Sequence, residues 1–130
     1  MNTPHDRPAP AERTARADRG DEASEVIALP EVGEQLLAEA RSARSGRAAR
    51  GLIALPGLRV TLLALAEGRE LAEHRAPGAA TLVCLAGQAT LSTADRAWTL
   101  GPDELLSIPD ERHRLTAETD ALVLLTVRLD

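Results

Sequence analysis

The feature that most constrains this chain is a change in hydrophobic period at Gly51. Downstream of Gly51, short segments rich in Leu, Val, Thr and Ala alternate with turn residues such as Pro-Gly and Gly-Pro-Asp. The segments are residues 51–55, 58–66, 70–75, 79–86, 88–92, 96–100, 104–108, 112–117 and 121–128. Strands this short and this closely spaced predict an antiparallel sandwich or barrel.

The chain upstream of Gly51 has a different character. Residues 30–45 place apolar side chains at helical spacing, with Pro30 at the start and Gly46 after the end, which predicts one helix. Residues 1–25 are rich in Pro, Ala and charge and have almost no large apolar side chain, so we expect a disordered tail. We therefore divide the chain into a tail (1–25), a helical segment (26–50) and a β domain (51–130).

The composition excludes several classes of function. All 15 basic residues are Arg, so the chain has no lysine for a Schiff base or a P-loop. A single cysteine, Cys84, excludes an internal disulfide and any zinc site built on two cysteines. The net charge of −5 argues against a nucleic-acid partner. Because we find no apolar run of about 18 residues and no secretory signal, we expect a cytoplasmic protein without a membrane partner.

Four arginines without an intervening acid lie near the end of the predicted helix: Arg41, Arg44, Arg47 and Arg50. Positive charge is favourable near a helix C-terminus, so a solvated helix end accounts for this cluster. A patch that binds an anion or a nucleic acid is the functional alternative.

Two histidines, His74 and His113, lie at regular distances from glycine, alanine and proline residues in the sequence. Five residues separate Gly68 from His74. Ala76 comes two residues after His74, Ala80 four residues after Ala76, and Gly87 seven residues after Ala80. Further on, the stretch from Asp103 to Pro109 leads to His113. These spacings, together with phrases such as GAATLVCLAGQATL and DELLSIPDERHRLTA, resemble the two motifs of the cupin superfamily over residues 51–130. The resemblance implies an all-β fold: a small antiparallel β-barrel of the jelly-roll, or double-stranded β-helix, type preceded by one α-helix.

The resemblance also implies where a metal would be held, and this chain departs from that pattern. His74 matches the first histidine of the motifs and His113 the last, but Ala76 stands at the second histidine and Ala80 at the glutamate. Alanine has no donor atom, so we expect no tightly held metal and no other cofactor. A weakly bound divalent cation is the alternative, with His74, His113 and Cys84 as its ligands, because Cys84 has the same strand parity as Ala80.

The family resemblance implies a cavity at one end of the barrel. Its predicted lining is His74, Ala76, Ala80, Leu82, Cys84 and His113. We expect this cavity to bind a small organic molecule. The alternative is an enzyme, an isomerase, lyase or dioxygenase-like cupin, in which His74 or His113 is the general base or a partial metal ligand. Apolar strands at residues 51–55 and 121–129 further predict a homodimer.

Overall fold

The computed structural model describes residues 24–75 and 78–129 and, for residues 73 and 74, the backbone. The predicted tail therefore lies outside the described residues up to residue 23. Helix α2 spans Leu29–Ser42, with Pro30 in its first turn, Glu31 near its positive N-terminal end and Arg41 in its last turn. It ends three residues before the predicted boundary, because Ala43 is extended and Gly46 turns the chain with a φ of 70°.

In the residues that the structure describes, nine strands follow the helix, one for each segment predicted from the sequence. They are β1 (Arg47–Leu55), β2 (Leu58–Leu65), β3 (Glu70–His74), β4 (Ala80–Ala86), β5 (Ala89–Ser92), β6 (Ala97–Leu100), β7 (Glu104–Ser107), β8 (His113–Ala117) and β9 (Ala121–Arg128). Strand β1 begins four residues earlier than expected, because residues 47–50 pair with residues 62–65 of β2. The arginine cluster is therefore divided between the helix, the connecting turn and β1.

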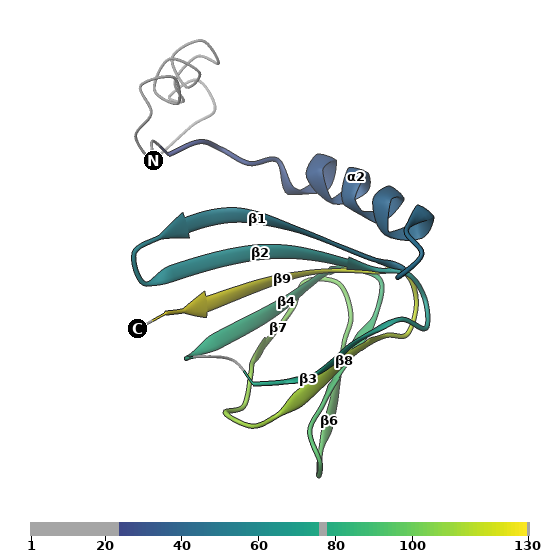
Figure 1. Cartoon of the computed structure of the whole chain (residues 1–130), viewed down its shortest axis with the longest axis vertical. Helices are drawn as coiled ribbons and strands as arrows, with labels where there is room; N and C mark the ends of the chain where they lie inside the picture. The colour runs from purple at the N-terminus through teal and green to yellow at the C-terminus, as the bar shows by residue number, and fades with distance from the viewer. Residues whose placement is uncertain (1–23, 76–77, 130) are drawn as a thin grey trace.

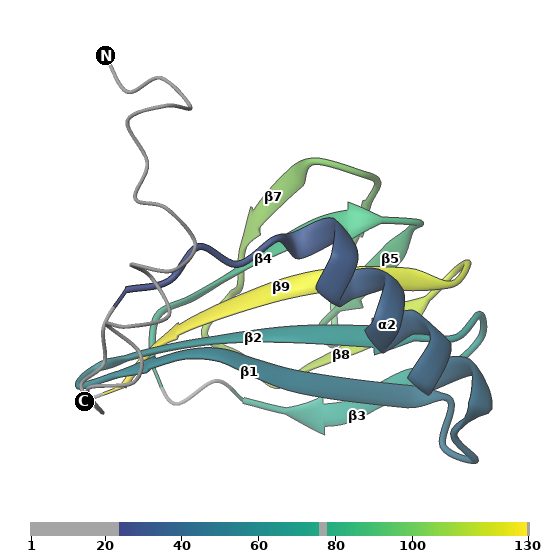
Figure 2. The same cartoon turned by 90° about the horizontal axis from the view of Figure 1, so that it is seen from above.

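The strands form two antiparallel sheets that face each other. One sheet has the order β1-β2-β9-β4-β7 and the other the order β3-β8-β5-β6. Helix α2 lies across the outer face of the first sheet, over β1 and β2 (Figures 1 and 2). Because the turn between β8 and β9 has only three residues, Ala117 and Ala121 lie at the same end of the sandwich.

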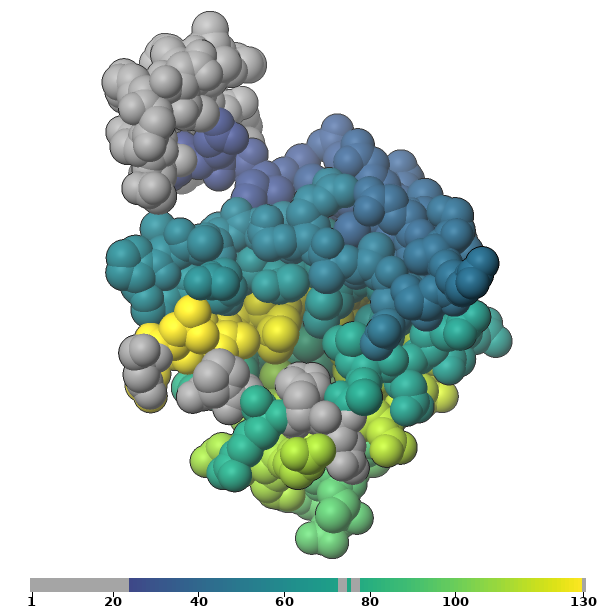
Figure 3. All heavy atoms as spheres, viewed as in Figure 1, coloured from purple at the N-terminus to yellow at the C-terminus, as the bar shows by residue number. Residues whose placement is uncertain are grey.

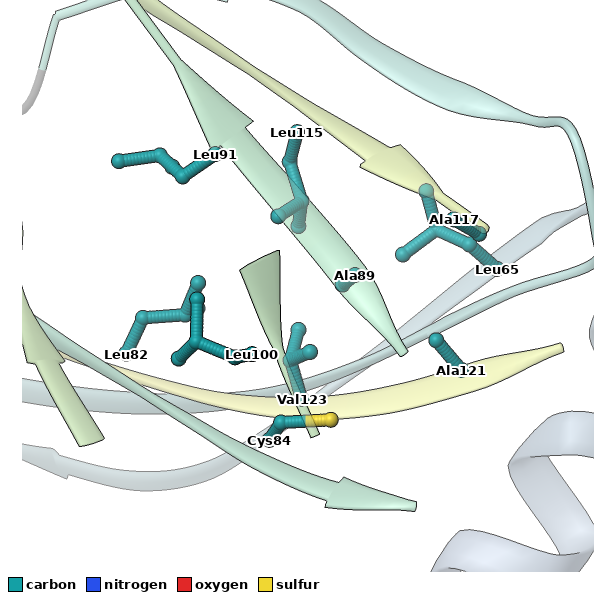
Figure 4. Close-up of a cluster of buried hydrophobic side chains, with 10 residues drawn as sticks. All are labelled: Leu65, Leu82, Cys84, Ala89, Leu91, Leu100, Leu115, Ala117, Ala121 and Val123. Carbon is teal, nitrogen blue, oxygen red and sulfur yellow. The ribbon is translucent and has the colours of Figure 1, made fainter. Parts of the chain in front are cut away.

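The main core fills the space between the sheets. Its buried residues are Leu65, Leu82, Cys84, Ala89, Leu91, Leu100, Leu115, Ala117, Ala121 and Val123. Figure 4 shows Ala117, Ala121 and Leu65 gathered at one end of this cluster, with Leu82 and Leu91 toward the other. In a chain without Phe or Tyr, leucines supply most of the buried volume. Each fully buried Leu contributes roughly 2 kcal/mol of hydrophobic stabilisation.

A second, smaller core attaches the helix to the first sheet. Leu36 and Ala40 of α2 pack on Leu62, Ala64 and Leu122, all of which are buried. The alternation along β2 explains both cores, because Leu62 and Ala64 face the helix while Leu65 faces the other sheet. No helix in the described part of the chain is long and apolar enough to cross a membrane.

Candidate functional site

His113 is the buried polar side chain that needs explanation. It begins β8, has 2% of its surface exposed, and is the one buried polar or charged side chain among the described residues. It shares its strand face with Leu115 and Ala117, which belong to the main core. The side chain of His113 therefore enters the interior of the sandwich from the end away from the β8–β9 turn.

The ring of His113 has a defined hydrogen-bonding role. Its Nδ1 lies 2.9 Å from the carbonyl oxygen of Glu111. A carbonyl oxygen can only accept, so Nδ1 carries the hydrogen and donates it. In the neutral ring, Nε2 is then the basic nitrogen, the one that can accept a proton or a hydrogen bond.

His74 occupies the position on β3 that is paired with His113. The register of the β3–β8 ladder matches the Cα of His74 with the Cα of His113, beyond an irregularity that follows Leu71. The two histidines singled out by the sequence thus lie at paired positions on neighbouring strands. That they share one pocket stays a prediction, and Ala76 lies outside the described residues.

The other predicted pocket residues lie on β4 and face inward. Ala80, Leu82 and Cys84 are 7%, 1% and 0% exposed, and their neighbours on the strand are less buried. Leu82 and Cys84 pack against other side chains of the main core, so neither side chain faces an open cavity.

The packing of the interior loosens from one end of β4 to the other. Cys84 pairs with Val123, and both are fully buried. Ala80, four residues earlier, pairs with Val127, which is half-buried. Leu125, beside Leu82, is also half-buried. Strand β8 ends and β9 begins at their shared turn. His113, at the start of β8, and Val127, near the end of β9, therefore both lie at the opposite end of the sandwich, which is the looser end.

Cys84 is poorly suited to bind a metal. Its Sγ lies 3.4 Å from the carbonyl oxygens of both Ala86 and Gly87, which accept a weak hydrogen bond from the thiol. Burial raises the pKa of the Cys84 thiol, so the protonated form is favoured. A metal ligand must be the thiolate. In addition, the described residues contain no group of three His, Cys, Asp or Glu side chains that could hold a metal ion together.

An ion pair that the sequence patterns did not predict joins the segment before His113 to the end of β3. Arg75 donates from Nε to Asp110 Oδ1 at 3.0 Å and from Nη2 to the carbonyl oxygen of Asp110 at 3.2 Å. The hydrogen bond from Arg75 and its charge lower the pKa of the Asp110 carboxyl. This contact ties the residue after β3 to the loop that supplies the Glu111 carbonyl. The sequence does carry a signal for this ion pair, because residues of opposite charge lie close to the two histidines. Arg75 follows His74, and Asp110 precedes His113 by three residues.

Open cavities lie on other parts of the fold. One, of about 360 Å³, lies between β1, β2 and β3. Another, of about 380 Å³, lies between the first half of α2 and residues of β4 and β9. A third, of about 340 Å³, lies between β6 and β7, where the two sheets are not paired.

No protein-family model matches this sequence, and no curated protein matches it significantly. Solved structures do match. A cupin superfamily protein from Desulfitobacterium hafniense is 22% identical, with a TM-score of 0.62 over 73% of this chain and 89% of that one. A conserved protein of unknown function from Streptococcus pyogenes is 20% identical, with a TM-score of 0.63 over 85% of this chain and 91% of that one.

An enzyme is also among the similar structures. Salicylate 1,2-dioxygenase from Pseudaminobacter salicylatoxidans is 17% identical, with a TM-score of 0.64 over 75% of this chain and 33% of that one. These likenesses establish the fold: the described part of the chain has a cupin fold, with helix α2 ahead of its strands, as the sequence predicted.

Proposed function

We propose that this protein binds a small organic molecule at the His113 end of the sandwich, without a tightly held metal. The observation that carries the proposal is the buried ring of His113 at the end where the core packs more loosely. Its hydrogen bond to Glu111 fixes one ring nitrogen, and the core that the ring enters consists mainly of leucine, alanine and valine side chains. A few polar groups in an apolar recess are typical of small-molecule sites.

The first test is a metal analysis of the purified full-length protein. We expect well under one equivalent of Zn, Fe, Mn or Ni, because Ala80 supplies no donor and the Cys84 thiol is held protonated. Close to one equivalent of a metal that is lost in His113→Ala would contradict the proposal.

The second test is a thermal-shift screen of small organic molecules. A compound that raises the melting temperature should do so through His113, so His113→Gln is expected to reduce the shift. Arg114→Gln is the matched control, because Arg114 is the next residue of β8 and is exposed on the opposite face. Equal shifts in both variants would exclude the His113 end as the binding site.

An enzyme that uses His113 as a general base is the second candidate function. The hydrogen bond from Nδ1 to the Glu111 carbonyl supports it, because this bond leaves Nε2 as the basic nitrogen of the neutral ring. A neutral imidazole with one exposed lone pair on nitrogen is a common general base in enzymes. Turnover of a screening hit by the wild type but not by His113→Gln, with binding retained in the variant, would distinguish catalysis from binding.

A further inference from the structure

The cavity between β1, β2 and β3 has a lining unlike that of the His113 end. It is lined by Ser45, Arg47, Ala48, Ala49, Leu63, Ala64, Leu65 and Leu71. The walls are therefore leucine and alanine, and the polar groups are one guanidinium and one hydroxyl. Its volume of about 360 Å³ is in the range of small-molecule sites.

The cavity exists because the two sheets differ in width. The first sheet has five strands with β1 at its edge, whereas the second has four strands with β3 at its edge. The register pairs Ala49 with Leu63 and Arg47 with Leu65, so these β1 residues face the same side as the core. Both β1 residues are nevertheless exposed, which leaves an apolar recess open to solvent at this edge.

Arg47 bridges the opening of this recess. Its Nη1 donates to the carbonyl oxygen of Glu70 on β3, at 3.3 Å. A guanidinium has five N–H donors, and this bond uses one of them. Ser45 Oγ lies 3.3 Å from both the backbone N and the carbonyl O of Arg47, so the hydroxyl is at the same rim.

Several arginines near the recess form no ion pair among the described residues. Arg41 pairs with Asp120, and Arg50 pairs with Glu39. Arg44, Arg47 and Arg69 have no carboxylate within ion-pair distance in the part of the chain that the structure describes. The side chain of Arg69 lies close over Gly46, next to Ser45 and Arg47, because a methyl group on Gly46 would be 2.5 Å from Arg69 Cγ.

We propose that this recess is a second binding site, for a small carboxylate with an apolar tail. The carboxylate pairs with Arg47, whose planar fork matches its two oxygens. The tail lies along Leu63, Leu65 and Leu71 and is removed from water there. The site is separate from the His113 end, since Leu71 pairs with Leu115 rather than with His113. It also gives Arg47, one of the four arginines of the cluster seen in the sequence, a role in binding an anion.

Calorimetry on the full-length protein with octanoate and 1-octanol tests the charge requirement. We expect saturable binding of octanoate and binding of 1-octanol that is about tenfold weaker or absent, since the neutral alcohol lacks the ion pair. Arg47→Gln should weaken octanoate binding by about tenfold. Arg50→Gln is the matched control, because Arg50 is on the same strand but faces α2, and it should bind octanoate like the wild type.

A second variant tests the location. Ala49→Phe places a ring in the recess at an exposed position, so the variant should fold and lose octanoate binding. The proposal is overturned if 1-octanol binds as tightly as octanoate, if Arg47→Gln and Arg50→Gln behave alike, or if Ala49→Phe still binds octanoate. It is also overturned if a second copy of the chain occupies the recess, so that Ala49→Phe dissociates a dimer and the wild type takes up no octanoate.

Discussion

Gly87 shows how one residue determines the geometry of the turn end of the sandwich. Its φ is 74°, in the left-handed region that favours glycine. A Cβ at this position would collide with the carbonyl oxygen of Asp120 and would lie 2.8 Å from Thr119 Oγ1. The turn before β5 and the turn between β8 and β9 therefore approach each other only because residue 87 has no side chain.

We predict that Gly87→Ala lowers the free energy of unfolding by roughly 2–4 kcal/mol, because the variant combines backbone strain with a collision against backbone. Gly51→Ala is the control, since Gly51 has an ordinary φ and a Cβ there would meet open space. Urea unfolding of both variants measures the difference. A Gly87→Ala protein as stable as Gly51→Ala would refute the close approach of the two turns.

Cys84 permits a chemical test of the core. Because the thiol is fully buried and burial raises its pKa, we predict that Cys84 reacts slowly with a thiol reagent such as DTNB in the folded protein at pH 8. Addition of urea to the unfolding range should make the reaction fast and stoichiometric. Rapid labelling without denaturant would mean that Cys84 is accessible and that the assignment of β4 to the core is wrong.

At the scale of elements, Asp120 joins the helix to the β8–β9 turn. Its Oδ2 accepts a hydrogen bond from Arg41 Nε at 2.7 Å, and its Oδ1 accepts one from the backbone N–H of Glu67 at 2.8 Å. These two hydrogen bonds, that of Arg41 foremost, lower the pKa of the Asp120 carboxyl. One carboxylate thus links the last turn of α2, the β2–β3 turn and the β8–β9 turn.

The lowered pKa predicts how this link depends on pH. The folded state favours the ionised form, so the stabilisation is fully present above the unfolded-state pKa of about 3.9 and is lost as the pH falls through the lower folded-state pKa. We predict that Asp120→Asn costs about 0.5–1 kcal/mol at pH 7, because the pair is partly exposed and screened, and almost nothing near pH 2. Urea unfolding at both pH values measures this. Asp95→Asn, at an exposed position in the β5–β6 turn, is the control; an equal loss at both pH values for Asp120→Asn would rule out the electrostatic origin.

At the scale of the whole molecule, local sequence patterns predict the strands but not the features that depend on how the two sheets are arranged. All nine strands were predicted, because each is bounded by turn residues and because inward positions such as Leu82 and Cys84 alternate with more exposed ones. The start of β1 was missed, because Arg47–Arg50 carries two arginines and continues the helical charge pattern. The recess beside Arg47 was missed for a different reason: it depends on the unequal widths of the two sheets, which no local pattern encodes.

The site is predictable only where its residues carry a motif. His74 and His113 were identified from spacing, and their paired positions on β3 and β8 are a consequence of the register. The hydrogen bond from His113 to Glu111 and the ion pair between Arg75 and Asp110 arise from the path of the loop before β8. Loop paths are set by packing across the whole domain, so single-sequence patterns do not fix them.

The outer face of the first sheet has exposed apolar side chains that favour a dimer. Helix α2 covers only the half of the β1–β2 hairpin that is nearer to Arg47 (Figures 1 and 3). Beyond the helix, Ile53 and Leu55 are 39% and 42% exposed. Ile53 pairs with Val60, and Leu55 pairs with Leu58, so four apolar side chains lie together at this end of the hairpin. Exposed apolar surface at a sheet edge favours association with another chain, and a second copy presents the same surface.

We therefore predict a homodimer formed through this end of the β1–β2 hairpin. Sedimentation equilibrium of the wild type should give about twice the monomer mass of 13.8 kDa. A double variant, Ile53→Glu with Leu55→Glu, should sediment as a monomer, because four carboxylates in a two-fold interface would have to lose water without partners. Leu105→Glu is the control, since Leu105 is 68% exposed on β7 at the opposite edge of the same sheet and should leave the dimer intact. A wild-type mass near 13.8 kDa at every concentration would exclude the dimer, and dissociation by Leu105→Glu alone would move the interface to the other edge.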